Sequence, residues 1–204
     1  MFQEAFKKLD LEEVALIVDQ LNPLLEGMSF DPLEVTVVGT EVSFYPGYKF
    51  IDVCDYSVAP PLRRFAIYKP GDLHILDWTN GPIYALNKKV PITLDEHNVF
   101  DYIRFFFGYV RGRHGRFIVT ENVDDIAWRE EPAAQNRKNV AEKIIPLTLV
   151  KREENGDFIV EGRMMFKDSL FKTFVRVESD GLVALFDEEL LIEDMPVLDD
   201  TFGH

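Results

Sequence analysis

The 204-residue sequence has few of the features that mark most catalytic, metal-binding or secreted proteins. Its single cysteine, Cys54, excludes an internal disulfide framework. No segment approaches the roughly 20 uncharged apolar residues that cross a bilayer. The apolar segment 103–110 is short and contains Arg104. Residues 1–4 lack the basic and apolar regions of a signal peptide, so we expect none. These absences predict a cytoplasmic protein without a membrane partner.

Motifs for metals, cofactors and nucleophilic catalysis are also missing. Histidines occur without Cys-x-x-Cys or His-x-x-x-His spacing, at His74, His97, His114 and His204. The glycines fit neither a phosphate loop nor a dinucleotide fingerprint, so we predict no metal and no cofactor. Cys54 follows apolar residues near the end of an expected strand, where a buried thiol is ordinary. This position favours a structural Cys54 over a nucleophile served by His74 or His114.

Positive charge is scarce: 22 Lys and Arg oppose 36 Asp and Glu, for a net charge of −14. Half of that charge lies in the last 18 residues, which hold no Lys or Arg and seven acids: Asp187, Glu188, Glu189, Glu193, Asp194, Asp199 and Asp200. Such a chain repels phosphate backbones and anionic lipid. We therefore predict no nucleic-acid partner and favour a basic protein, or no macromolecular partner.

The first half of the sequence predicts one helix and a small antiparallel meander. Asp10 and Glu13 have N-cap and N3 spacing for a helix over 11–21. Its apolar face is expected to comprise Leu11, Val14, Val18 and Leu21. β-Branched and aromatic runs predict strands at 33–38, 41–45, 48–54, 63–68, 73–77 and 83–86. Reversals are expected at 69–72 and at Asn80-Gly81.

An aromatic segment in the middle of the chain predicts a long buried helix. Thr93 and Glu96 have the spacing of a capping box, and Gly112 is placed to end the helix in a left-handed C-cap. Apolar residues cover nearly the whole circumference: Val99, Phe100, Tyr102, Ile103, Phe105, Phe106, Phe107, Tyr109 and Val110. A helix that is apolar nearly all round is enclosed by other elements.

The enclosing elements are expected to follow in sequence. A short strand at 117–120 and a helix at 133–145 precede strands at 147–152, 158–166, 170–177 and 182–186, with hairpin signals at Asn155-Gly156 and Asp180-Gly181. A buried helix followed by an antiparallel meander resembles the cystatin-like arrangement, in which a curved sheet grips a helix. The prediction is an α+β fold, with residues 1–204 forming a single compact unit and a seam near residue 91, between 1–91 and 92–204.

The best candidate site is the string Arg111-Gly112-Arg113-His114-Gly115-Arg116. Guanidinium groups match carboxylate or phosphate oxygens in a bidentate way, and the glycines allow a tight turn. We therefore predict an anion-binding site at Arg111, Arg113, His114 and Arg116. The alternative is structural: cations are favoured at a helix C-terminus, and nearby acids can pair with them, namely Glu121, Asp124, Asp125, Glu130 and Glu131.

The acidic C-terminal segment is amphipathic, with apolar residues between its acids. Residues through Ile192 are expected to extend the last strand. Beyond Pro196, Leu198 and Phe202 are expected to dock on the chain's own fold, in preference to a basic groove on a partner.

Three functions are consistent with the sequence. The favoured one is a non-enzymatic binding or regulatory module with an anion-binding Arg/His cluster. The second is a hydrolase- or isomerase-type enzyme for an anionic ligand, with His114 as acid/base and Arg111, Arg113 and Arg116 holding the substrate. The third is a homo-oligomer subunit whose sheet face is covered by a copy of itself.

Overall fold

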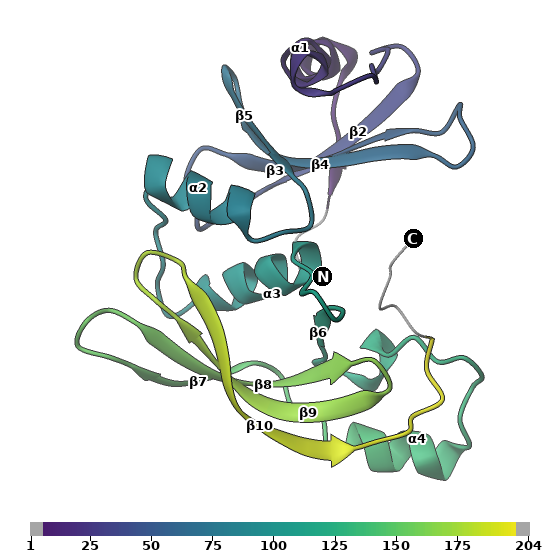
Figure 1. Cartoon of the computed structure of the whole chain (residues 1–204), viewed down its shortest axis with the longest axis vertical. Helices are drawn as coiled ribbons and strands as arrows, with labels where there is room; N and C mark the ends of the chain where they lie inside the picture. The colour runs from purple at the N-terminus through teal and green to yellow at the C-terminus, as the bar shows by residue number, and fades with distance from the viewer. Residues whose placement is uncertain (1–5, 199–204) are drawn as a thin grey trace. The chain divides into compact units, whose positions relative to one another are not determined.

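The computed structural model describes residues 6–198 and shows an α+β protein with helices and two antiparallel sheets. Its contacts separate two compact units (Figure 1). The N-terminal unit comprises residues 6–77 and 81–93, and the C-terminal unit comprises residues 78–80 and 94–198. The expected single compact unit with a seam near residue 91 stays a prediction. No helix within residues 6–198 is long and apolar enough to cross a membrane.

The sheet of the N-terminal unit is an antiparallel meander, as expected, in which each strand pairs with the next. It consists of β1 (Lys7–Lys8), β2 (Val35–Glu41), β3 (Lys49–Asp55), β4 (Leu62–Lys69) and β5 (Asp72–Leu76). The separate strands expected at 33–38 and 41–45 were wrong, because residues 35–41 form one strand through Gly39 and residues 43–47 form a turn. The predicted reversal at 69–72 is confirmed: Lys69 pairs with Asp72, and Gly71 has φ 82°. Proline followed by a glycine with positive φ is the preferred sequence of a type II turn.

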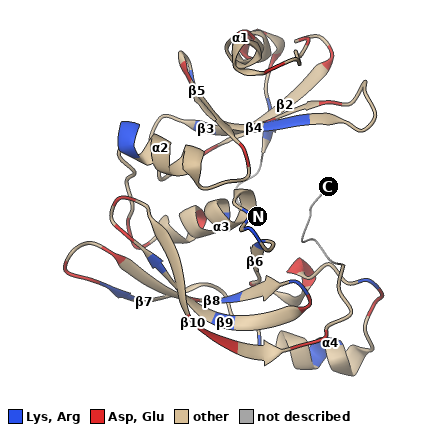
Figure 2. Ribbon diagram, in the orientation of Figure 1, with Lys and Arg blue, Asp and Glu red and all other residues tan. Residues whose placement is uncertain are grey.

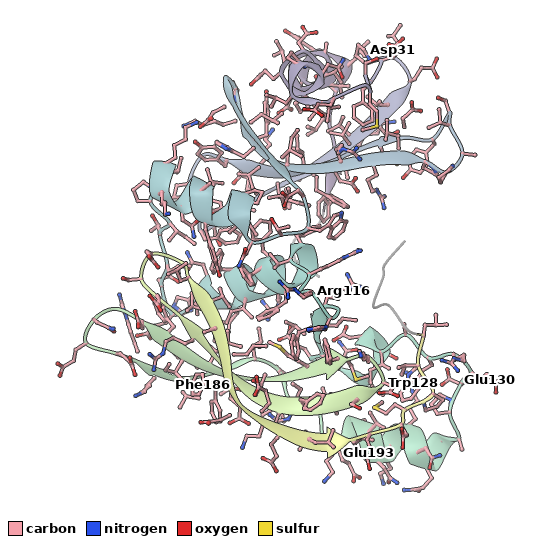
Figure 3. The ribbon with its side chains drawn as sticks, viewed as in Figure 1. Asp31, Arg116, Trp128, Glu130, Phe186 and Glu193 are labelled. Carbon is pink, nitrogen blue, oxygen red and sulfur yellow. The ribbon has the colours of Figure 1, made fainter. Side chains whose placement is uncertain are left out.

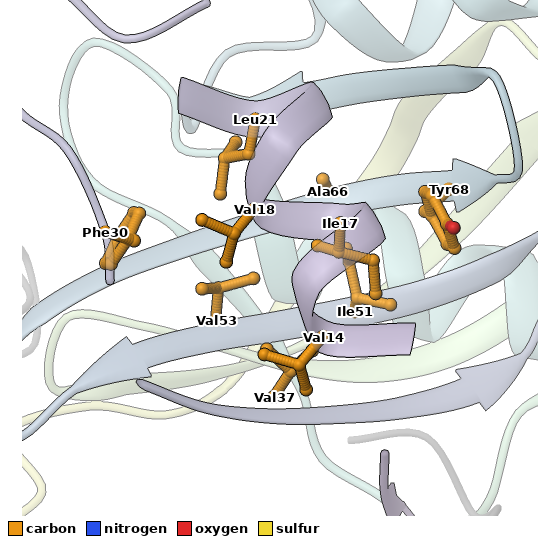
Figure 4. Close-up of a cluster of buried hydrophobic side chains, with 10 residues drawn as sticks. All are labelled: Val14, Ile17, Val18, Leu21, Phe30, Val37, Ile51, Val53, Ala66 and Tyr68. Carbon is orange, nitrogen blue, oxygen red and sulfur yellow. The ribbon is translucent and has the colours of Figure 1, made fainter. Parts of the chain in front are cut away.

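Helix α1 (Leu11–Leu21) packs on one face of this sheet (Figure 4). The Asp10 side chain accepts a hydrogen bond from the Glu13 amide at 2.9 Å, as the capping prediction requires. Val14, Ile17, Val18 and Leu21 are buried in one cluster with β2, β3 and β4 side chains. Leu11 is 58% exposed, so its assignment to the packed face was wrong. The buried stripe begins at Val14 and includes Ile17, which lies three residues after Val14 and four residues before Leu21.

Residues 81–89 differ from the expected strand. They form helix α2 (Gly81–Lys89), in which Ile83 and Leu86 are buried while Ala85 is exposed. Apolar residues three apart share a helix face, whereas in a strand they would face opposite ways. Pro82 is also favourable in the first turn of a helix, where its missing N–H is not needed. Asn80-Gly81 therefore precedes a helix and does not close a hairpin.

In the C-terminal unit, the central aromatic segment forms α3 (Val99–Tyr109). Six of its side chains are buried: Val99, Tyr102, Ile103, Phe105, Phe106 and Phe107. The Tyr102 hydroxyl donates to the Gly181 carbonyl at 2.6 Å, which fixes the helix to the turn between two later strands. The prediction of a buried helix is thus confirmed.

The two predicted ends of this helix were wrong. The N-cap residue of α3 is Asn98, not Thr93, and the Asn98 side chain caps no amide of the helix. In the turn before the helix, the Asp95 side chain accepts from the Asn98 amide and the Asn98 side chain accepts from the Asp95 amide, both at 2.8 Å. At the other end the cap residue is Val110, with φ −118°, and it is extended. Gly112 is therefore outside the helix and is not its left-handed cap.

A second antiparallel sheet completes the C-terminal unit, together with α4 (Ala134–Ala141). Its strands are β6 (Phe117–Val119), β7 (Thr148–Arg152), β8 (Phe158–Phe166), β9 (Ser169–Val177) and β10 (Val183–Ile192). β8 pairs with β9 along its whole length, and its other edge pairs with β7 at residues 158–161 and with β6 at residues 164–166. The predicted turns at 155–156 and 180–181 are confirmed, with φ 93° at Gly156 and 84° at Gly181.

The last described residues dock on the chain's own fold, as expected, but through different side chains. Val197 forms a bridge with Trp128, and the Leu198 amide donates to the Ala127 carbonyl at 2.8 Å (Figure 3). Met195 and Val197 are buried in a small apolar cluster, whereas Leu198 is 56% exposed. The expected contact through Leu198 was therefore wrong, and Phe202 lies outside the described residues.

Candidate anion-binding site

The predicted cluster forms a tight hairpin between α3 and β6. The Gly112 amide donates to the Gly115 carbonyl at 2.8 Å, and the Gly115 amide returns a hydrogen bond to Gly112 at 3.2 Å. Arg113 and His114 are the two residues at the tip, and both are exposed. A Cβ on Gly112 would lie 3.2 Å from the Gly115 carbonyl oxygen, so this close approach favours glycine.

Arg111 stands at the base of this hairpin in a fixed position. Its amide donates to the Trp78 carbonyl at 2.8 Å, and its guanidinium carbon lies 3.9 Å from the centre of the Trp78 ring. Trp78 has φ 69°, which is rare for a bulky residue, and its ring stacks on Tyr109 at 6.1 Å. A cation over an indole face is electrostatically favoured, so the stack orients Arg111.

The four predicted residues therefore fall into two pairs. Arg111 and Arg116 are half-buried and take part in further interactions. Arg113 and His114 project from the tip into solvent. The hairpin holds all four in one short segment just before β6, where Figure 2 shows blue ribbon and Figure 3 labels Arg116. An anion approaching the tip would meet the exposed pair first, in the field of the two anchored arginines.

Three of the five acids expected to neutralise this cluster contact other arginines. Glu121 binds Arg104 through two hydrogen bonds of 2.6 and 2.9 Å. Burial by itself would raise the pKa of Glu121, but the hydrogen bonds and charge of Arg104 outweigh it and hold that pKa below its usual value. Asp124 and Glu131 both contact Arg137.

Asp125 is also engaged locally, because its carboxylate accepts hydrogen bonds from the Glu121 and Asn122 amides at 2.8 and 3.0 Å. Of the five acids, Glu130 is the one for which residues 6–198 offer no such contact. These contacts weaken the structural alternative for Arg113 and His114, since four of the five nearby carboxylates bind elsewhere.

The geometry needed for acid/base catalysis by His114 is not formed within the described residues. No side chain or backbone group of residues 6–198 forms a hydrogen bond or ion pair with its ring. A catalytic histidine ordinarily has a partner that orients it and selects its tautomer. The hairpin can attract an anion, but no group of residues 6–198 orients the His114 ring for proton transfer.

The cysteine and the other histidines do not form a site either. Cys54 is buried in β3 and pairs with Arg63 of β4. His74 lies on β5, on the other side of β4, and pairs with Ile67, which is four residues after Arg63. The two side chains are therefore not brought together. Within residues 6–198 no group of three or more His, Cys, Asp or Glu side chains is arranged to hold a metal ion.

One polar cluster was missed by sequence reasoning. The Asp72 carboxylate accepts hydrogen bonds from the Tyr48 hydroxyl and the Lys89 ammonium, both at 2.6 Å, and His74 Nε2 lies 2.9 Å away. Burial favours a higher pKa for Asp72, but the hydrogen bonds from Lys89 and Tyr48 and the charge of His74 hold it at about 2. Asp72 in a turn was visible in the sequence, but its partners come from α2 and β3.

Comparisons with known proteins add no relative. No protein-family model matches the chain, and no curated protein or solved structure does so. The architecture defines the class, an α+β protein with two antiparallel sheets.

Proposed function

We propose that this protein is a non-enzymatic binding or regulatory module that takes a small anion at the 111–116 hairpin. The observation that supports the proposal is the exposed Arg113–His114 tip, because three of its five neighbouring acids contact Arg104 or Arg137 instead. Arg113 supplies a planar fork of N–H donors suited to carboxylate or phosphate, and His114 adds a donor. Arg111 and Arg116 raise the local positive potential.

The proposal also covers the fold around the hairpin, the location of the protein and a second class of partner. A cystatin-like arrangement of α3 and the second sheet would place the hairpin at the rim where the helix ends. A single cysteine supports a cytoplasmic location. The net charge of −14 independently favours a basic protein as a second class of partner.

Thermal unfolding of the full chain with phosphate, sulfate and citrate tests the anion proposal. At an anion concentration ten times the dissociation constant, binding stabilises the folded state by about 1.4 kcal/mol, which raises the Tm of a chain of this size by about 4 °C. The increase should disappear in Arg113→Ala. Sodium chloride at matched ionic strength separates specific binding from general screening.

Arg64→Ala is the matched control, because Arg64 is a half-buried residue of β4 and its guanidinium hydrogen-bonds the neighbouring Arg63 carbonyl. This variant should keep the full anion-dependent increase in Tm. An unchanged Tm in all three anions, or an increase that survives in Arg113→Ala, would contradict the proposal.

A further inference from the structure

A second candidate site lies on the sheet of the C-terminal unit, away from the hairpin. Strand register places Ile159 opposite both Lys151 and Arg176, and Phe174 opposite Phe186. Side chains two apart on a strand share a face, so these five residues belong to one face of the sheet. The fully buried Val160, Val175 and Val177 belong to the other face. We call the first one the Phe174 face.

A groove of about 220 Å³ is present on the Phe174 face. Its apolar floor is formed by Ile159, Phe174 and Phe186, and the two phenyl rings stack with centroids 5.7 Å apart (Phe186 is labelled in Figure 3). Both rings are half-buried, so each keeps apolar surface in contact with water. A small apolar group that covered this surface would be stabilised by the hydrophobic effect.

Four charged residues border the groove: Lys151, Glu153, Arg176 and Asp187. Lys151 and Glu153 form an ion pair of 2.8 Å, and the hydrogen bond and charge of Lys151, together with the charge of Arg176, lower the pKa of Glu153. Arg176 lies over the Phe186 ring, with its guanidinium carbon 5.9 Å from the ring centre. Within residues 6–198, neither Arg176 nor Asp187 forms an ion pair. Arg176 and Asp187 therefore provide one positive and one negative group, neither in an ion pair within residues 6–198, at the rim of the groove.

Asp187 is held at this rim by an irregularity in β10. The pairing of β10 with β9 shifts between Phe186 and Glu189, and Asp187 has φ 53°. A bulge inserts an unpaired residue and re-aims its side chain, and Asp and Asn are among the few residues that tolerate positive φ. The bulge therefore places Asp187 at the groove, next in sequence to Phe186 of the groove floor.

We propose that this groove binds a small zwitterion of the amino-acid type with an apolar side chain. The ligand carboxylate pairs with Arg176, its ammonium pairs with Asp187, and its side chain covers Phe174 and Phe186. A ligand carrying both charges is selected because either charge alone would leave one rim group uncompensated. This site is independent of the anion proposed for the hairpin.

Titration of the ¹⁵N-labelled full chain with L-phenylalanine, followed by amide chemical shifts, tests the inference. Shift changes should centre on Phe174, Arg176, Phe186 and Asp187. Phenylacetate, which lacks the ammonium, and phenethylamine, which lacks the carboxylate, should each bind about ten-fold more weakly, a difference of about 1.4 kcal/mol. Arg176→Gln and Asp187→Asn should each weaken L-phenylalanine binding by a similar factor.

Arg152→Gln is the matched control. Arg152 lies on the same sheet with its guanidinium 5.1 Å from the Phe158 ring, but it pairs with Phe158 on the opposite face. This variant should bind L-phenylalanine as the wild type does. Absence of shifts on the Phe174 face, equal binding of the singly charged analogues, or an equal loss in Arg152→Gln would overturn the inference. None of these results bears on anion binding at Arg113.

Discussion

The carboxylate of Asp72 receives three side chains from three elements, β3, β5 and α2. Its pKa of about 2 is lower than the ordinary value of 3.8. An acid with a lowered pKa stabilises the folded state above its unfolded-state pKa, and this stabilisation is lost as the pH falls through the folded-state pKa. The contribution of Asp72 is therefore complete above about pH 4 and disappears towards pH 2.

We expect Asp72→Asn to lower the free energy of unfolding by about 1–2 kcal/mol at pH 7, because two charge-assisted hydrogen bonds are lost. The difference from wild type should shrink between pH 4 and pH 2, as measured by urea denaturation. Asp19→Asn, which alters an exposed side chain of α1, is the control and should change stability by less than about 0.5 kcal/mol. A difference that is independent of pH would contradict the role given to Asp72.

Two arginine–carboxylate ion pairs differ in burial, so the cost of losing each one shows how burial affects the stability that an ion pair contributes. Arg104 is 9% exposed and Glu121 is 17% exposed, whereas the Asp124 partner of Arg137 is 77% exposed. Removing one partner of a buried pair leaves an uncompensated charge. We expect Arg104→Met to cost about 3 kcal/mol and Arg137→Met less than about 1 kcal/mol in chemical denaturation.

The double variant Arg104→Met/Glu121→Gln should recover part of the loss, because the second change removes the stranded charge. Equal costs for the two single arginine variants would show that burial does not govern these pairs.

At the scale of elements, local patterns predicted those structures whose signals lie within a few residues. Asp10 and Glu13 located the start of α1, and Asn155-Gly156 located the β7–β8 turn. The aromatic run of α3 predicted a buried helix, but its start was misplaced, because the Thr93 amide bonds the Phe44 carbonyl and the helix begins only after the Asp95–Asn98 turn.

Segments with competing local signals were assigned less well. Asn80-Gly81 is a hairpin signal, and the strand at 83–86 was predicted from it, although Ile83 and Leu86 have the spacing of a helix. The hairpin at 111–116 was predicted as a cluster, but its anchoring was not. Trp78 lies more than 30 residues before Arg111, and no local pattern connects them.

The helical assignment of α2 leads to a specific prediction. Ile83→Ala should cost about 2–4 kcal/mol because Ile83 is buried, whereas Ala85→Lys should change stability by less than about 0.5 kcal/mol. In a strand, residues 83 and 85 would share a face, and the lysine would be as disruptive as the alanine. Urea denaturation of the two variants distinguishes these outcomes.

At the scale of the whole molecule, the acidic C-terminal segment is tied to the fold through Val197, which is 4% exposed. We expect Val197→Asp to cost about 3 kcal/mol, because it places an unpaired charge in the apolar cluster around Ile126 and Met165. Leu198→Asp, one residue further, should change stability by less than about 0.5 kcal/mol. Similar costs for both variants in urea denaturation would show that the segment is not docked through Val197.

The distribution of charge over the molecule makes the hairpin unusual. A net charge of −14 repels anions at long range, so a bound anion requires a strong local positive potential. Arg113 supplies that potential at the tip, with Arg111 fixed by Trp78 at the base of the hairpin. Attraction at such an exposed site should weaken as ionic strength rises.

Mapping phosphate binding on the ¹⁵N-labelled full chain tests the central proposal most directly. The account predicts saturable amide shift changes confined to Gly112, Arg113, His114, Gly115 and Arg116, beyond those produced by sodium chloride at the same ionic strength. The changes should be absent in Arg113→Ala. Shifts that do not saturate, that lie elsewhere in the chain, or that persist in Arg113→Ala would contradict an anion site at this hairpin.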